Sequence, residues 1–182
     1  MNLQELLVTL IIVVIIFSIV FASYLTYINV YKVQLVRNTL STELSRIFAV
    51  STKSVRGATE VVASLTIGGN TYTTGSHTVI VKSPAIDAND LIVNNAYDYF
   101  ILTSPVGTPN SLVMITEADP ASARSSTTTT LTTHLSSLQI NYDSETTVDI
   151  SRVELILSLS QFAANRTITN TGQSTIFLRN SP

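Results

Sequence analysis

The chain carries few side chains that could perform acid–base, nucleophilic or metal chemistry. Its 182 residues include two histidines and no cysteine. His77 and His134 each lie in a Thr/Ser-rich stretch, and neither stands at metal-ligand spacing from an acidic residue. The lack of cysteine excludes disulfides, thiol nucleophiles and thiolate metal sites. The sequence therefore predicts a protein that is not an enzyme and that binds no metal and no cofactor.

The acidic residues after position 86 are dispersed along the chain rather than paired for catalysis. They include Asp87, Asp90, Asp98, Asp119, Asp143, Glu145 and Asp149. The nearest approach to the alternating acids of a calcium loop is Asp87-Ala88-Asn89-Asp90, and a turn explains it equally well. Gly68-Gly69 is also predicted to be a turn, because no phosphate-loop Lys-Thr follows it.

Two polar stretches are candidates for modification by sugars. Asn165-Arg166-Thr167 fits the rule for an N-glycosylation acceptor, which makes Asn165 a possible glycosylation site. Thr127–Thr130 could carry O-linked sugar, with a plain exposed loop as the alternative. Neither motif settles whether the protein is glycosylated.

The charge distribution argues against specific nucleic-acid binding, which requires a basic patch or stripe. The formal net charge is −2. Two modest basic clusters lie on a predicted helix, and a solvated helix face explains both. They are Lys32 with Arg37, and Arg46 with Lys53 and Arg56.

Glu5 is the one ionisable residue whose surroundings demand a partner. The chain is apolar and uncharged from Leu6 through Val30, which exceeds the roughly 20 residues that a helix needs to cross a bilayer. In lipid only a helix satisfies its own backbone groups, so a helix is predicted despite the many β-branched residues. A charge at the end of such a span is costly and is a functional candidate. The only nearby positive group is an α-amino terminus, either the chain's own or a neighbour's.

Two simpler explanations of the apolar run are a signal peptide and a plain membrane anchor. A signal peptide needs a basic n-region and a short apolar core, whereas here no Lys or Arg precedes Lys32 and the run is too long. A plain anchor stays possible, but it does not explain Glu5. We expect the numbering to start at the mature residue, with any leader already removed.

These first residues resemble the mature N-terminus of the type IV pilin family, which comprises pilins and the pseudopilins of type II secretion. Mature members start with an apolar or aromatic residue and carry glutamate at the fifth position before an apolar helix, and Met1 and Glu5 match. The resemblance implies self-assembly, in which Glu5 pairs with the N-terminal amine of a neighbour. It further implies that the apolar helix forms a filament core, through Leu3, Leu6, Leu7, Leu10, Val13, Val14, Phe17, Phe21 and Tyr24.

The same resemblance implies the partners and the location of the protein. The chain would form a helical homopolymer at the cell surface, fed by a precursor pool in the inner (cytoplasmic) membrane. A prepilin peptidase and the pilus assembly machinery would act on it. N-terminal methylation, which is frequent in the family, stays open. The alternatives are a minor pilin, a secretion pseudopilin or a single-span surface-binding module. Adhesion, motility, DNA uptake and secretion all stay open as roles.

The family often interrupts the apolar helix with a glycine and a proline, at positions that correspond to Val14 and Ala22 in this chain. Neither breaker is present. Whether the helix unwinds between these positions in a filament therefore stays open.

The element that positions Glu5 is a single predicted helix over Asn2–Arg56, with Gly57 as its C-cap. Residues 1–30 would be the membrane anchor or filament core, and residues 31–57 an amphipathic half packed on a globular domain. The packed half is indicated by an apolar stripe at helical spacing. The stripe consists of Val33, Val36, Leu40, Leu44 and Ile47.

Residues 58–182 are predicted to form a β-rich globular domain, which makes the fold α+β: a long N-terminal helix packed on an antiparallel sheet. The expected strands are Thr59–Ile67, Thr71–Thr74, His77–Val81 with an end at Pro84, Leu91–Val93, Tyr97–Leu102, Leu112–Thr116, Leu135–Tyr142 and Ile150–Leu159. Ala121–His134 is predicted to be a loop or an exposed edge. A final hairpin is expected from Arg166–Asn170 and Ser174–Arg179, with its turn at Thr171-Gly172-Gln173.

Overall fold

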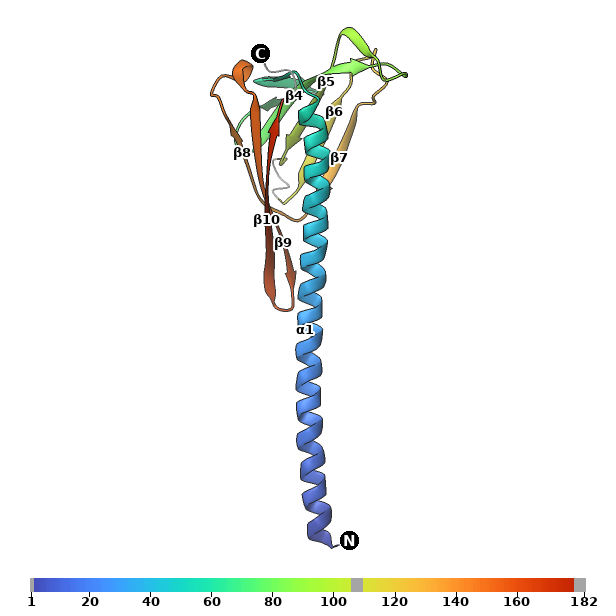
Figure 1. Cartoon of the computed structure of the whole chain (residues 1–182), viewed down its shortest axis with the longest axis vertical. Coiled ribbons are helices and arrows are strands. Elements are labelled where there is room, and N and C mark those ends of the chain that lie inside the picture. Colours follow the sequence, from blue (N-terminus) through green and yellow to red (C-terminus); the bar gives the residue numbers. More distant parts are fainter. Residues whose placement is uncertain (1, 106–109, 179–182) are drawn as a thin grey trace.

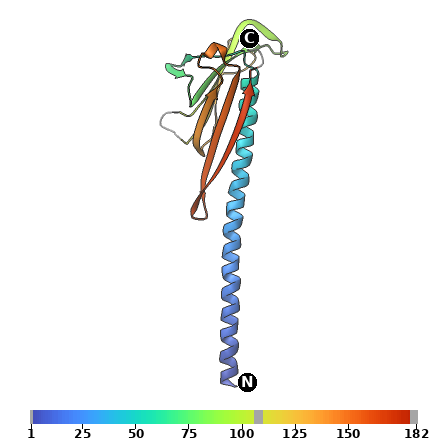
Figure 2. The same ribbon diagram turned by 60° about the vertical axis from the view of Figure 1, so that its left-hand side comes forward.

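A computed structural model describes residues 2–105 and 110–178 and shows an α+β fold, as predicted (Figure 1). One long helix, α1, projects from a β-rich globular part, and the N-terminal end lies far from it in both views (Figures 1 and 2). The elements in chain order are α1 Leu3–Arg56, β1 Glu60–Val61, β2 Ser64–Ile67, β3 Asn70–Thr73, β4 Thr78–Ile86, β5 Ile92–Thr103, β6 Leu112–Glu117, β7 Thr127–Thr132, β8 Leu135–Tyr142, a 3₁₀ helix Thr147–Asp149, β9 Arg152–Ala163 and β10 Arg166–Phe177.

Helix α1 is 54 residues long, which corresponds to roughly 80 Å at 1.5 Å per residue. It runs without interruption through Val14 and Ala22. Its C-cap is Gly57, as predicted, but the residue has φ −80° and is right-handed, so the cap does not use the left-handed region. The Ser83 hydroxyl instead donates a hydrogen bond to the Gly57 carbonyl over 3.1 Å and fixes the helix end to β4.

The described strands form two main antiparallel sheets and a small hairpin. The first sheet has the order β1-β4-β5-β6-β7, and the second has the order β10-β9-β8. Strands β2 and β3 form the hairpin, whose predicted turn at Gly68 and Gly69 has positive φ at both residues. Figure 2 shows the β9–β10 hairpin lying along α1 and reaching furthest toward its N-terminal half.

The core lies between the second half of α1 and the two sheets. Four of the five predicted stripe residues are buried, and the fifth, Val36, packs against them while half-buried. Strand β9 supplies alternating inward residues that are completely buried in this core. These inward residues are Val153, Leu155, Leu157 and Leu159.

Strand β4 does not end at Pro84, as the sequence suggested, but continues to Ile86. Proline lacks an N–H and is tolerated only where no ladder bond is needed. Strand β1 pairs with β4 only at Val81 and Lys82. At Pro84, β4 is therefore not paired with β1. Proline there costs no sheet hydrogen bond, and Pro84 stays opposite Tyr97 of β5.

The predicted final hairpin is wrong in its turn. Strand β10 runs unbroken over Arg166–Phe177 and pairs with β9 along its whole length, while Arg179 lies outside the described residues. The turn is at Ala164 and Asn165, which have φ 49° and 61°. Gly172 lies in mid-strand because the ring of Phe48 occupies the place of a side chain, only 2.6 Å from where a Cβ would stand.

Two further segments, which form β5 and β7, differ in part from the strands predicted from the sequence. Leu91–Val93 and Tyr97–Leu102 are not separate strands but belong largely to one long strand, β5, with a positive φ of 58° at Asn95. Within Ala121–His134, the exposed-edge alternative is correct for β7, which pairs with β6 on one side only. Its first four threonines are exposed.

Candidate assembly surface

The first half of α1 has no cover from the rest of the chain. Among the described residues, α1 is the one helix whose length and composition would let it cross a membrane. The most apolar 18 residues of α1 have a mean hydropathy of 3.1, and none of them is buried. The predicted filament-core residues are all exposed, from 53% at Leu6 to 83% at Leu3. They lie all around the helix rather than on one face. Met1 lies outside the described residues.

Glu5 lies in the first turn of α1, where its carboxylate has a local partner. The backbone N–H of Asn2 donates to Oε2 of Glu5 over 3.1 Å, and the N–H of Glu5 donates to the Asn2 carbonyl over 2.9 Å. A glutamate at this position caps the helix and interacts favourably with the helix dipole. Oε1 of Glu5 accepts no hydrogen bond from residues 2–105 or 110–178, so it is open to a further donor.

The hydroxyl groups of the apolar half bond back to their own helix. Thr9 donates to the Glu5 carbonyl over 2.8 Å, Ser18 donates to Val14 over 2.7 Å, and Thr26 donates to Ala22 over 3.0 Å. Each bond satisfies a donor that neither lipid nor an apolar neighbour could satisfy. These hydroxyls therefore do not oppose burial of the helix surface.

Three tyrosines lie at the end of the apolar half of α1 that is nearest the globular part. Tyr24, Tyr27 and Tyr31 are between 58% and 68% exposed. Tyrosine concentrates at membrane–water interfaces, because its ring is apolar and its hydroxyl is polar. The first buried stripe residue, Val33, follows them directly.

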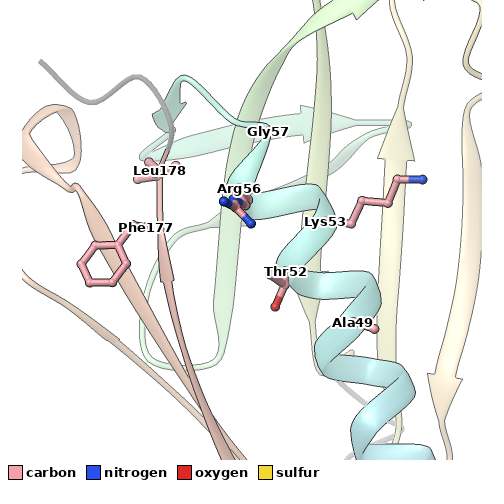
Figure 3. A pocket seen from close by; sticks show the side chains of 7 residues that line it. All are labelled: Ala49, Thr52, Lys53, Arg56, Gly57, Phe177 and Leu178. Atoms are coloured by element: carbon pink, nitrogen blue, oxygen red, sulfur yellow. The ribbon is translucent and has the colours of Figure 1, made fainter.

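The globular part has a hollow of about 810 Å³ beside the last turns of α1 and the end of β10 (Figure 3). Arg56 and Lys53 are the charged residues of its lining, and their side chains point to different sides of the helix. Phe177 stands across from them, 65% exposed. No acid or histidine belongs to the described lining.

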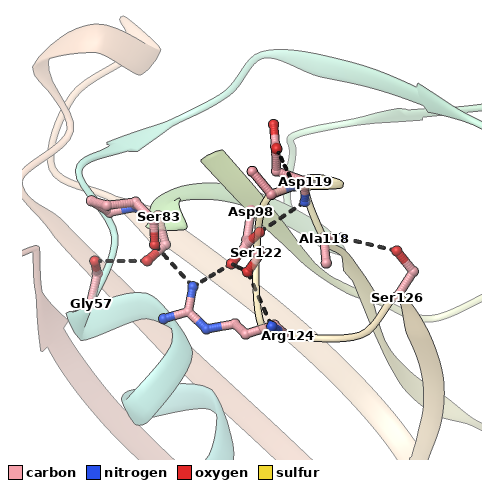
Figure 4. A network of polar contacts seen from close by, with 10 residues as sticks. Gly57, Ser83, Asp98, Ala118, Asp119, Ser122, Arg124 and Ser126 are labelled. Atoms are coloured by element: carbon pink, nitrogen blue, oxygen red, sulfur yellow. Dashed lines mark hydrogen bonds and ion pairs between the residues drawn. The ribbon is translucent and has the colours of Figure 1, made fainter. Parts of the chain in front are cut away.

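A buried ion pair at the far end of the globular part is the strongest polar cluster that sequence reasoning missed (Figure 4). Asp98 is completely buried, and its Oδ2 lies 2.5 Å from Nη1 of Arg124. The Ser122 hydroxyl donates to the same oxygen, the Asp119 N–H donates to Oδ1, and Arg124 also donates to the Pro84 carbonyl. These bonds tie the β6–β7 connection to β5 and β4.

This cluster had a signal in the sequence. Asp98 has the same strand parity as Ala96 and Leu102, which are buried, so alternation alone points its carboxylate inward. A buried acid requires a cation, and Arg124 is the one cation of the connection between β6 and β7. The carboxylate of Asp98 accepts hydrogen bonds from the Asp119 N–H, the Ser122 hydroxyl and the Arg124 guanidinium. These contacts indicate a structural role, in which Asp98 holds the β6–β7 connection in place.

The two histidines lie apart and hold no metal-like cluster. His134 Nδ1 lies 3.2 Å from Oε2 of Glu43 on α1, and His77 Nδ1 lies 2.8 Å from the Ser76 hydroxyl. Within the described ranges, no three His, Asp or Glu side chains come together as a metal site would require. Asp87 forms a turn, in which its carboxylate accepts hydrogen bonds from the backbone N–H groups of Leu91 and Asn89 and its pKa is thereby lowered.

Asn165 lies at the exposed tip of the β9–β10 hairpin, where a glycosylation acceptor would be reachable. Within residues 2–105 and 110–178, the predicted site residues Glu5 and Asn165 lie at separate places in the fold. The structure leaves one large apolar surface, residues 3–31 of α1, with a carboxylate at its start. A search of family models, of characterised protein sequences and of solved structures found no match to this chain.

Proposed function

We propose that the chain is the structural subunit of a cell-surface filament of the type IV pilin kind. The observation that carries this proposal is the uncovered first half of α1, an apolar surface all round a helix that the globular part leaves bare. Monomeric proteins rarely expose a contiguous apolar area of this extent unless another molecule covers it. Lipid would cover it before assembly, and the same halves of neighbouring copies would cover it afterwards.

The energetics separate release into water from transfer into a filament. Apolar area removed from water is worth roughly 25 cal/mol per Å², so exposing this helix to water would be prohibitive. Exchange of lipid for neighbouring helices gains far less, because both surroundings are apolar. We therefore expect extraction from the membrane to consume energy from an assembly motor.

Glu5 would set the stagger between neighbours in this proposal. A carboxylate buried without a partner costs several kcal/mol, so the bundle is favoured only where the α-ammonium of a neighbour meets Glu5. The capping bond from Asn2 uses Oε2 and holds the side chain at the helix start, which leaves Oε1 for the incoming amine. A contact between different surfaces on the two copies is head-to-tail, and it repeats into a filament when its rotation does not close a ring.

The test is a pair of variants that separates the charge of Glu5 from its capping role. Glu5→Gln keeps the size of the side chain and can still accept the Asn2 N–H, but it loses the charge. Glu5→Ala loses both. We expect both variants to stay folded and membrane-held, with incorporation into filaments lowered at least about tenfold, as 1.4 kcal/mol or more of lost pairing implies. Normal filaments from Glu5→Gln would reduce Glu5 to a helix cap and contradict the pairing.

The abundance of the chain distinguishes the remaining candidates. Electron microscopy and mass spectrometry of sheared surface material would identify a major subunit if this chain dominates thin filaments. A minor pilin would be rare in them, and a pseudopilin or surface-binding module would stay in the membrane fraction. The major subunit is favoured here because the exposed apolar surface surrounds the whole helix, which suits contact with several copies at once.

A further inference from the structure

The hairpin tip between β4 and β5 lies at the end of the molecule opposite the N-terminus (Figures 1 and 2). It carries exposed apolar and acidic side chains. Leu91 and Ile92 are 63% and 68% exposed. Asp90 is exposed and makes no side-chain bond to a described residue, while Asp87 holds the turn with its backbone hydrogen bonds. This turn is rigid, because Asp87 and Leu91 also bond through their backbones and Ala123 donates to Ile86.

The hairpin tip between β9 and β10 lies at the opposite end of the globular part (Figures 1 and 2). It carries one exposed apolar and one exposed basic side chain. Phe162 is 69% exposed on one face of the hairpin. Arg166 is exposed, and its guanidinium makes no hydrogen bond or ion pair to the described part of the chain. The turn at Ala164 and Asn165 has the double positive φ of a tight hairpin, so this tip is also rigid.

We propose that these two tips bind each other between successive copies of this chain, so that the β4–β5 tip of one copy lies against the β9–β10 tip of another. The β4–β5 tip offers two exposed apolar side chains and the β9–β10 tip offers one. Each tip also carries a charge with no partner among the described residues, and the two charges have opposite sign. Because the tips lie at opposite ends of one molecule, a copy cannot satisfy its own pair. This inference rests on the proposed filament and names the contact between its globular parts.

The contact is too small to drive assembly by itself. A stable complex buries about 1,200 Å² or more, and a few side chains on each tip fall well below that area. The tips therefore meet only when the helix bundle already holds two copies in line. Their part is to fix the rotation and spacing of the globular parts, because opposite charges steer a contact into register and like charges exclude wrong ones.

The absence of cysteine in this chain makes the contact directly measurable. A Leu91→Cys and Phe162→Cys double variant, assembled into filaments and treated with a short thiol–thiol crosslinker, should give a ladder of multimers on a denaturing gel. Each single variant should stay monomeric. The matched control is Leu91→Cys with Phe177→Cys, since Phe177 is similarly exposed but lies at the other end of β10. It should give no ladder.

A second measurement tests the charges. Asp90→Asn keeps a residue that tolerates the φ of 61° at this position, and Arg166→Gln keeps a long polar side chain. In the cysteine background each change should slow ladder formation roughly two- to fivefold at low salt, and the double variant should be no slower than the singles. Additive effects of the two changes would contradict the ion pair.

The outcomes separate this inference from the proposed function. Filaments that form normally without a ladder, or that give an equal ladder with the Phe177 control, overturn the tip contact and leave the filament standing. A wild-type chain that forms no filaments overturns both. A ladder that requires both tips, together with non-additive charge effects, supports the contact.

Discussion

The two halves of α1 are parts of one continuous helix, yet they meet opposite surroundings. The second half has an apolar stripe, and the stripe is buried by the sheets of the same chain. The first half is apolar on all sides and remains exposed along its length. A one-sided helix needs one partner surface, which a single globular part provides. A helix that is apolar all round needs partners on every side, and these must come from outside the chain.

The comparison also explains where the globular part ends. Tyr31 is exposed and Val33 is buried, so the change from outside partners to inside partners takes less than one helical turn. The β9–β10 hairpin reaches furthest along α1 and packs its Ala163 and Ala164 against the core. The boundary is thus set by the length of this hairpin.

The largest expected effect tests the comparison with one substitution made in each half. Leu40 is completely buried, whereas Leu10 is 60% exposed. Leu40→Ala should lower the free energy of unfolding of the globular part by about 2–5 kcal/mol, because it removes buried methyl groups and leaves a cavity. Leu10→Ala should leave that free energy unchanged. Chemical unfolding of the full chain in detergent micelles, followed by near-ultraviolet circular dichroism, measures both.

Equal losses from the two leucine variants would break the comparison, since the exposed half would then contribute to the stability of the globular part. The exposed half should matter elsewhere: Leu10→Ala is expected to weaken filament cohesion in the assembly assays for Glu5.

An intermediate effect is expected where β10 touches α1. A Cβ at Gly172 would lie 2.6 Å from the Phe48 ring, and the ring is packed against the core. Gly172→Ala should therefore destabilise the globular part by about 1–3 kcal/mol through overpacking. The control Gly75→Ala meets no atom within 4 Å and should have little effect. Adding Phe48→Leu to Gly172→Ala should recover part of the loss, because the two side chains compete for one space.

The sequence was sufficient for the helix and for its stripe, because both depend on local periodicity. Asn2–Arg56 was predicted and Leu3–Arg56 is observed, with four of the five stripe residues buried. The strands with strict alternation, such as β9, were also predictable. The bare surface of the candidate site follows from the same run of apolar residues.

The errors arose where distant contacts decide what a local signal means. Gly172 looks like a turn residue, but it serves the close approach of Phe48, which lies more than a hundred positions away in the chain. Pro84 looks like a strand end, but β1 is too short to need its missing N–H. The pairing of Asp98 with Arg124 depends on how the β6–β7 connection folds back, which periodicity cannot supply.

The smallest effect concerns how the two sheets of the globular part hold together without help from the exposed helix. The Tyr142 hydroxyl of β8 donates to the carbonyls of Gly75 and Thr78 over 3.1 and 3.0 Å, which links the second sheet to the first. Tyr142→Phe should lower the free energy of unfolding by about 1 kcal/mol near neutral pH, since a hydrogen bond contributes roughly that much.

The pH dependence of this link has a definite sign. Burial raises the pKa of Tyr142 above its ordinary value of 10.0, so the folded chain holds the phenol proton more tightly than the unfolded chain does. The contribution of this group is complete below the unfolded value and is lost as the pH rises toward the folded one. The difference in unfolding free energy between wild type and Tyr142→Phe should therefore be constant at lower pH and shrink as the pH rises above about 10. A constant difference up to about pH 11 would show that the pKa of Tyr142 is not raised by burial. Helicity of the first half of α1, held in micelles, should not change in either protein, because its partners lie outside the chain.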